Sequence, residues 1–251
     1  MIFSCISIFP EIFASLTNFG VTGRAFDNNI CQLQLINPRD FTSDSYKRID
    51  DKSFGGGPGM VMKIEPLELS LNDAIVRQEK LGNNAPLRVY LSPQGQPVDQ
   101  SMINQLAGHA GIIFVCGRYE GVDERFINRN IDLELSTGDF VVSGGELPAM
   151  LVMDAIIRQL PGVLNDEESA ISDSFMNGLL DYPHYTQPRE YEDAAVPDVL
   201  LSGNHEQIKR WRLQMSLWRT YLRRPDLLTK RNLTKLESGL LDELVVKNKQ
   251  K

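Results

Sequence analysis

Three segments of the sequence each end a β-rich run in a turn that carries glycine and polar residues. They are LRVYLSPQGQ at 87–96, GIIFVCGRYEGVDER at 111–125 and STGDFVVSGGELPAM at 136–150. Glycine lets a backbone approach a ligand closely, so three such turns could surround one pocket with backbone N–H and C=O groups. Such a pocket suits a planar heterocycle with a polar tail. Each turn taken alone could equally be an ordinary tight turn, and the residues name no ligand.

A fourth glycine-rich string, SFGGGPGM at 53–60, has the composition of a phosphate-binding loop without its sequence context. Val61, Met62 and Lys63 follow it, whereas the phosphate loop of an NTPase ends in Lys-Ser or Lys-Thr at the start of a helix. Neither that pattern nor the dinucleotide fingerprint GxGxxG occurs in the chain. The sequence therefore disfavours a phosphate-loop NTPase and moves the expected active site to the three other turns.

The acid–base candidates are carboxylates, because none of the three histidines stands beside a serine or cysteine in a nucleophile motif. The ligand spacings of zinc and EF-hand sites are absent as well. Asp173 stands near the end of the polar stretch PGVLNDEESAISDS, which is typical of a linker, and Asp181 follows shortly after. A carboxylate on a linker can close over a substrate as a general base. Either residue could also be a solvated surface group.

The segments that must position these residues alternate between short apolar runs and helical patterns, which is typical of a mostly parallel α/β sheet. LRVYLSP and GIIFVCG are almost continuously apolar, as strands buried on both faces are. Ligands of such sheets gather beyond the carboxyl ends of the strands, where the glycine-marked turns begin. The predicted strands are Phe3–Phe9, Cys31–Ile36, Leu87–Leu91, Gly111–Cys116 and Phe140–Val142; the predicted helices are Pro10–Leu16, Pro66–Glu79, Gln100–Ala107, Glu124–Asn128 and Gly145–Gln159.

The charge of the chain is divided unevenly. Residues 1–202 carry 14 Lys and Arg against 28 Asp and Glu, whereas residues 203–251 carry 12 against 5. A helix is predicted over Asn204–Arg223, with an apolar stripe expected in the core (Ile208, Trp211, Met215, Trp218 and Leu222). Beside the stripe, four residues form what we name the basic ridge: Lys209, Arg212, Arg219 and Arg223. The ridge suits contact with nucleic-acid phosphates, and a solvated helix face is the alternative.

The cysteine pattern and the N-terminal sequence bear on the compartment. The three cysteines lie far apart without a CxxC pair, which favours a reducing, cytosolic setting. The apolar start MIFSCISIFPEIF is short and has no positively charged residues before it, as the n-region of a signal peptide would have, so no signal peptide is expected. No apolar run approaches the ~20 residues that span a bilayer. We therefore expect a cytoplasmic protein with no membrane segment.

Eleven strings of the sequence, in order, resemble the bacterial tRNA (guanine-N1)-methyltransferase family. They are SIFPEIF, GVTGRA, NPRDF, DDKSFGGGPGM, YLSPQGQ, CGRYEGVDER, GDFVVSGGELPAM, PGVL, DSF, GLLDYPHYT and LLSGNHEQIKRWR, and they run from about Met1 to about Pro225. Members of the family methylate the guanosine just 3′ of the anticodon (position 37 of tRNA). Phe140 is a departure, because the family often has tyrosine there.

The resemblance implies a SPOUT-type α/β fold: a mostly parallel sheet with a deep trefoil knot, plus a smaller, mainly helical C-terminal domain. We expect a knotted methyltransferase domain at 1–162, a flexible linker at 163–174 and a helical tRNA-binding domain at 175–251. The resemblance also implies a homodimer with the active site at the subunit interface. SFGGGPGM is then expected to be a mobile loop near that interface, close to the cofactor or the tRNA.

The resemblance implies S-adenosylmethionine (S-adenosyl-L-methionine) as methyl donor, held by the three glycine-marked turns. The family is reported to use magnesium (Mg2+), which no residue spacing here predicts. The residues expected to hold the methyl donor are Tyr90, Leu91, Ser92, Pro93, Gln94, Gly95, Gly117, Tyr119, Glu120, Gly121, Thr137, Gly138, Asp139, Phe140, Val141, Val142, Gly144, Gly145 and Pro148.

The chemistry implied by the resemblance can be argued physically. A sulfonium methyl group is already activated, so its transfer needs no metal and no covalent nucleophile. Guanine N1 carries a proton at neutral pH, and a general base must remove it. By resemblance Asp173 is that base, and Arg158 stabilises the negative charge that develops on the guanine. Two other functions stay open: a knotted methyltransferase that acts on another RNA, and a tRNA-binding protein without catalysis.

Overall fold

The computed structural model describes residues 1–165 and 173–249, and the chain divides into two compact units, Met1–Asn165 and Asp166–Lys251. Most of the predicted linker at 163–174 lies outside the described residues. Among the described helices, none combines the length and the apolar character needed to cross a membrane.

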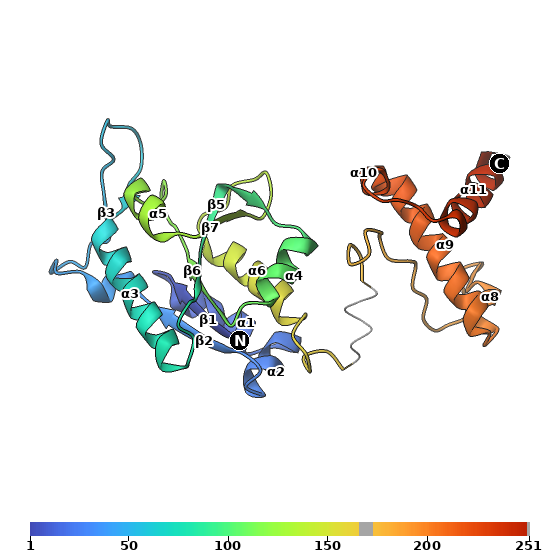
Figure 1. The fold of residues 1–251 in the computed structure, drawn as a ribbon, viewed down its shortest axis with the longest axis horizontal. Helices are drawn as coiled ribbons and strands as arrows, with labels where there is room; N and C mark the ends of the chain where they lie inside the picture. The colour runs from blue at the N-terminus through green and yellow to red at the C-terminus, as the bar shows by residue number, and fades with distance from the viewer. Residues whose placement is uncertain (166–172, 250–251) are drawn as a thin grey trace. The chain divides into compact units, whose positions relative to one another are not determined.

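The first unit is built on a five-stranded sheet with the strand order β2-β1-β6-β5-β7 (Figure 1). Every neighbouring pair in it is parallel, which confirms the predicted α/β class. The central strand β6 is buried at every residue, as its unbroken apolar sequence predicts. The strands are β1 (Ile2–Ile6), β2 (Gln32–Ile36), β5 (Leu87–Pro97), β6 (Gly111–Val115) and β7 (Leu133–Ser136).

Helices cover both faces of the sheet. Successive side chains of a strand point to opposite faces, so the apolar strand β6 presents apolar side chains on both and each face needs a cover. Ile112 and Phe114 of β6 belong to the core that α4 and α6 complete, and Ile113 and Val115 to the core that α3 and α5 complete. The elements of this unit outside the sheet are η1 (Pro10–Phe13), α1 (Ala14–Thr17), α2 (Gly20–Asp27), η2 (Pro38–Phe41), the antiparallel pair β3 (Asp50–Asp51) and β4 (Val61–Met62), α3 (Ile64–Lys80), α4 (Gln100–Ala107), α5 (Glu124–Asn130) and α6 (Glu146–Ile157).

Two of the predicted elements are wrong. The strand predicted at Phe140–Val142 is an irregular loop with exposed side chains, and the strand of this region is β7. β7 lies at the edge of the sheet. Its region reads IDLELS, and because acidic residues interrupt the apolar ones, no unbroken apolar run predicts this strand. The helix predicted at Pro10–Leu16 is a 3-10 turn, η1, that continues into the single turn α1.

The second unit is mainly helical. Its helix α9 begins as predicted, because Asn204 Oδ1 accepts a hydrogen bond from Gln207 N at 3.1 Å. The predicted apolar stripe is partly wrong: Leu222 is 59% exposed, whereas Leu217 of α9 is buried in a core with residues of α11. The elements are the hairpin β8 (Glu190–Tyr191) and β9 (Ala194–Ala195), α8 (Asp198–Leu201), α9 (His205–Arg223), α10 (Pro225–Thr229) and α11 (Lys235–Lys249).

Candidate active site

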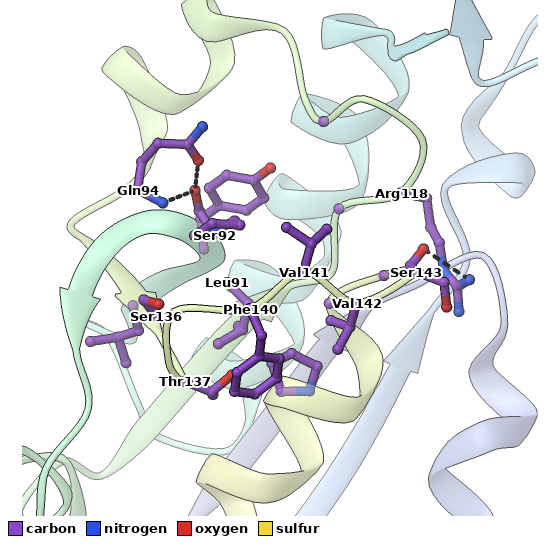
Figure 2. Close-up of a pocket in the computed structure, with 18 of the residues that line it drawn as sticks. Leu91, Ser92, Gln94, Arg118, Ser136, Thr137, Phe140, Val141, Val142 and Ser143 are labelled. Atoms are coloured by element: carbon purple, nitrogen blue, oxygen red, sulfur yellow. Dashed lines mark hydrogen bonds between the residues drawn. The ribbon is translucent and has the colours of Figure 1, made fainter. Parts of the chain in front are cut away.

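A pocket of about 220 Å³ lies at the carboxyl ends of β5, β6 and β7, where parallel sheets bind their ligands (Figure 2). Three loops form it: the first loop (92–95), the second loop (117–121) and the third loop (137–145). Every residue predicted to hold the methyl donor lines this pocket except Gly95 and Asp139. Four further residues line it: Arg118, Leu135, Ser136 and Ser143.

The first loop is an interruption of β5. Leu91 and Gln96 both pair with Leu135 of β7, so the residues between them leave the sheet. A Cβ atom on Gly95 would lie 2.5 Å from the backbone nitrogen of Leu135, so only glycine lets the chain rejoin its neighbour there. Inside the loop, Ser92 Oγ accepts a hydrogen bond from Gln94 N at 3.2 Å. Gly95 thus shapes the first loop from outside the pocket.

The second loop turns sharply above the carboxyl end of β6. Tyr119 and Gly121 have positive φ angles of 59° and 128°, and Tyr119 is 48% exposed. A Cβ atom on Gly117 would lie 2.8 Å from Tyr90 Oη, so the glycine makes room for this ring. Burial raises the pKa of Tyr90 to about 12, helped by the charge of Glu134, so its hydroxyl stays protonated at neutral pH.

The glycine-rich string SFGGGPGM ends against the second loop. Glu120 N donates to Met60 O at 3.0 Å, and Met62 N donates to Gly121 O at 2.9 Å. Gly59 has a φ of 81°, and a Cβ atom on it would lie 2.3 Å from Glu120 Oε1. The string therefore packs against the backbone and the side chain of a residue that lines the pocket.

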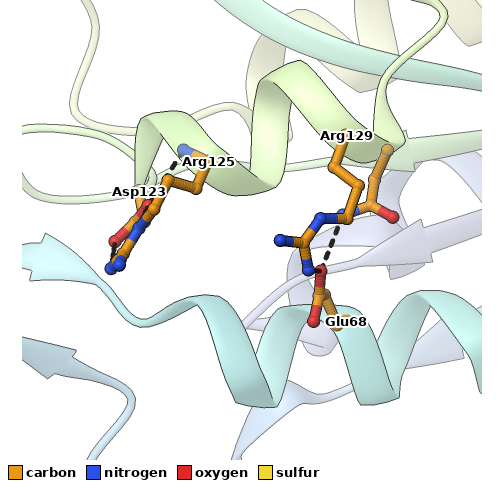
Figure 3. Close-up of polar contacts among 5 residues, drawn as sticks. Glu68, Asp123, Arg125 and Arg129 are labelled. Carbon is orange, nitrogen blue, oxygen red and sulfur yellow. Dashed lines mark hydrogen bonds and ion pairs between the residues drawn. The ribbon is translucent and has the colours of Figure 1, made fainter.

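The helix that follows the second loop is fastened to α3 (Figure 3). Arg129 Nη1 and Asn130 Nδ2 both donate to Glu68 Oε1 of α3, at 3.0 and 3.1 Å. Asp123 caps α5 and accepts hydrogen bonds from Arg125 N and Nε, both at 2.9 Å. The bond from the Arg125 side chain lowers the pKa of Asp123. The segment that follows the second loop is thus held in place by contacts within α5 and with α3.

The third loop leaves apolar side chains on the rim of the pocket. Phe140 is 59% exposed and Val141 is 84% exposed, although both line it. Ser136 Oγ donates to Gly138 O at 3.2 Å and fixes the start of the loop. Asp139 is exposed and does not line the pocket. Exposed apolar side chains of the third loop therefore form part of the rim of the pocket.

Arg118 is the pocket residue that sequence reasoning missed most clearly. It stands inside the quoted string CGRYEG, between residues that were predicted, so its position was the available signal. Its guanidinium Nε donates to Glu146 Oε2 at 2.9 Å, and its Nη1 donates to Ser143 O at 3.2 Å. Figure 2 shows Arg118 beside Ser143 at one end of the pocket.

The two predicted catalytic residues belong to different units, Arg158 to the first and Asp173 to the second. Arg158 follows the last residue of α6 in the first unit, where its N donates to Asp154 O at 3.2 Å. Asp173 belongs to the second unit, and its carbonyl accepts from Met176 N at 3.3 Å. The adjoining Ser174 Oγ accepts from Asp181 N at 2.9 Å. Asp173 is therefore anchored through its neighbours to the loop that contains Asp181.

The basic ridge on α9 also meets that loop. Arg212 lies over the ring of Tyr182 at 4.8 Å, and Arg219 Nη1 donates to Asp181 O at 3.4 Å. Asp181 Oδ2 in turn contacts His184 Nε2 at 2.7 Å. Two of the four ridge residues thus hold the loop that positions the Asp173 segment, a contact that the helical pattern alone did not predict.

Comparison with known proteins identifies the family. Residues 1–230 match the family described as tRNA (Guanine-1)-methyltransferase TrmD. Proteins named tRNA (guanine-N(1)-)-methyltransferase are similar over almost their full length. The one from Nitrosospira multiformis is 55% identical over 96% of this chain and 95% of the relative. The one from Chromobacterium violaceum is 56% identical over 95% and 93%. The chain belongs to the tRNA (guanine-1)-methyltransferase family.

Proposed function

We propose that the chain transfers a methyl group from S-adenosylmethionine to N1 of the guanosine immediately 3′ of the anticodon (position 37) in tRNA. The observation that carries the proposal is the convergence of three glycine-marked loops on one pocket, in a chain of this family. The runners-up are a methyltransferase for another RNA and a tRNA-binding protein without catalysis, and no residue of the pocket favours either.

The residues of the pocket fit the methyl donor. Apolar side chains and the backbone of the first and third loops suit a flat heterocycle, since Leu91, Pro93 and Val142 line the cavity. Glu120 supplies a carboxylate that suits a cationic ligand. When bound, S-adenosylmethionine supplies a methyl group already activated for transfer. The protein then has to orient that group, exclude water and remove one proton.

Asp173 is the proposed base for the guanine N1 proton, and Arg158 the proposed partner for negative charge on the guanine. These residues lie in different units, so the proposal requires the second unit to bring Asp173 over a pocket when tRNA docks. The contacts of the Asp181 loop with the basic ridge support this, because a ridge that binds tRNA would act directly on the Asp173 segment.

A homodimer with the pocket at its interface, and a deep trefoil knot around that pocket, complete the proposal. Exposed apolar side chains next to the pocket support the dimer: Leu147 and Leu151 on α6 are each 58% exposed, and Val141 is 84% exposed. The two leucines lie four residues apart on one helix face, and a contiguous apolar patch of this kind marks an interaction surface. Three buried free cysteines accord with the proposed cytoplasmic location.

Mg2+, which the resemblance implies, has no ready-made cluster of protein ligands among the described residues. Among them, no group of three or more His, Cys, Asp or Glu side chains is placed to hold a metal ion. No step of the proposed reaction is therefore assigned to the metal.

Transfer of labelled methyl groups from S-adenosylmethionine to unmodified tRNA transcripts tests the proposed function. Transcripts that carry guanosine at position 37 should be labelled, and matched transcripts with another base there should not. A structured RNA without an anticodon loop serves as the control for another substrate. Absence of transfer to every transcript, or equal labelling without the guanosine, would refute the proposal.

A further inference from the structure

Glu146 is a buried carboxylate that no role proposed above explains. It lies in the first turn of α6 and is 0% exposed. Ser7 Oγ donates to its Oε1 at 2.7 Å, and Arg118 Nε donates to its Oε2 at 2.9 Å. A buried charge is tolerated only when it is paired and hydrogen-bonded, and the start of a helix favours negative charge further. The carboxylate therefore joins the residue that follows β1, the second loop and α6 at one point.

Two glycines make that junction possible. A Cβ atom on Gly144 would lie 2.2 Å from Arg118 Nε, so the arginine reaches Glu146 only because residue 144 has no side chain. A Cβ atom on Gly145 would lie 2.8 Å from the Cα of Cys116. Because glycine lacks this atom, the two backbones can approach each other closely. Gly145 N then donates to Gly117 O at 2.9 Å. The string SGGE is thus shaped to receive the second loop as well as to line the pocket.

The second loop needs such a restraint. Tyr119 holds a φ of 59°, in the left-handed region that residues other than glycine rarely adopt, and it stands directly before Glu120. Backbone conformations of this kind persist only where surrounding contacts fix them. The side chain of Arg118, immediately before Tyr119, supplies contacts to Glu146, to Ser143 O and to the ring of Phe9 at 4.7 Å.

We propose that Glu146 and Arg118 are positioning residues, which lock the second loop against the third loop so that Tyr119 and Glu120 face the methyl donor. This inference rests on the proposed pocket for S-adenosylmethionine. It assigns the pair a function in binding and transfer rather than in stability alone. The pair acts through the loop, and Glu146 does not line the pocket.

The test is a double-mutant cycle with S-adenosylmethionine as the probe. Glu146→Gln should weaken its binding by about 10–100-fold, the scale on which small displacements of a functional group act. In an Arg118→Met background, the same substitution should have little further effect, because its partner is already absent. Asp73→Asn is the matched control, since it also removes an ion pair of the first unit, with Arg77 at 2.7 Å, and should leave the affinity unchanged.

Hydrogen exchange of the ligand-free chain separates this inference from the proposed function. Glu146→Gln should speed exchange of the Glu120, Gly121 and Gly145 amides, even if S-adenosylmethionine proves not to be the ligand. If Glu146→Gln does not fold, Ser7→Ala removes one hydrogen bond from the carboxylate and should give the same effects, reduced to a few-fold. Unchanged affinity and unchanged exchange in the folded variant, or fully additive effects in the cycle, would overturn the inference.

Discussion

Replacement of Gly95 by alanine tests how the first loop is built. The new Cβ atom would lie 2.5 Å from Leu135 N and 2.6 Å from Glu134 C, both backbone atoms that cannot rotate away. Ordinary van der Waals contact begins at 3.4 Å, so β5 and β7 must separate by about 1 Å. Overpacking of this kind costs about 1–3 kcal/mol. For a chain of this size each kcal/mol corresponds to about 2–4 °C, so we expect a melting temperature about 2–12 °C lower.

Thermal unfolding with and without S-adenosylmethionine measures both consequences of Gly95→Ala. The variant should melt earlier than the wild type, and the ligand should raise its melting temperature less, because the first loop no longer closes correctly. Gly239→Ala in α11 is the control: nothing lies within 4 Å of its Cβ position, and a helical alanine should stabilise by about 0.5–1 kcal/mol. A Gly95→Ala chain that melts and binds like the wild type would refute the reasoning.

Three further predictions follow from the described contacts. Burial raises the pKa of Cys31 to about 11, so native protein at pH 8 should resist thiol reagents that label all three cysteines in denaturant. The Arg88 hydrogen bond lowers the pKa of Asp132 in the folded chain. The pair therefore stabilises the fold fully above pH ~4, the ordinary pKa of aspartate, and this stabilisation is lost as the pH falls below it. The difference in melting temperature between wild type and Asp132→Asn should therefore shrink from pH 6 to pH 3; an equal difference at both would contradict the pairing. Arg212→Glu with Arg219→Glu should weaken tRNA binding, measured by filter retention, without changing S-adenosylmethionine affinity. Unaltered tRNA affinity would refute contact of the basic ridge with tRNA.

The sequence predicted those parts of the site whose signals are local. Apolar runs marked the strands. The turn that interrupts β5 and the turn that follows β6 bring their residues to one pocket, because parallel strands run toward the same edge of the sheet. The apolar pattern does not predict β7, because an edge strand needs no unbroken apolar run. It predicts a strand at Phe140–Val142 instead, which is wrong. The same exposed residues form the rim of the pocket instead.

Contacts between distant residues could not be predicted from patterns. Ser7 and Glu146 are 139 positions apart, and the sequence around neither residue predicts their hydrogen bond. Gly95 illustrates a related limit, because a glycine that admits a neighbouring strand looks the same in sequence as one that admits a ligand. The basic ridge was visible as a helical pattern, but its contacts with Tyr182 and Asp181 depend on how a loop without periodicity folds.

Nucleoside analysis of a methylated tRNA transcript is the most direct test of the central claim. After incubation with S-adenosylmethionine, the wild-type chain should yield 1-methylguanosine from the position 3′ of the anticodon. Asp173→Ala should bind S-adenosylmethionine as the wild type does, yet transfer the methyl group at least ~100-fold more slowly, the lower range for loss of a general base. A methyl group on another atom or nucleoside, or an unimpaired Asp173→Ala chain, would contradict the account.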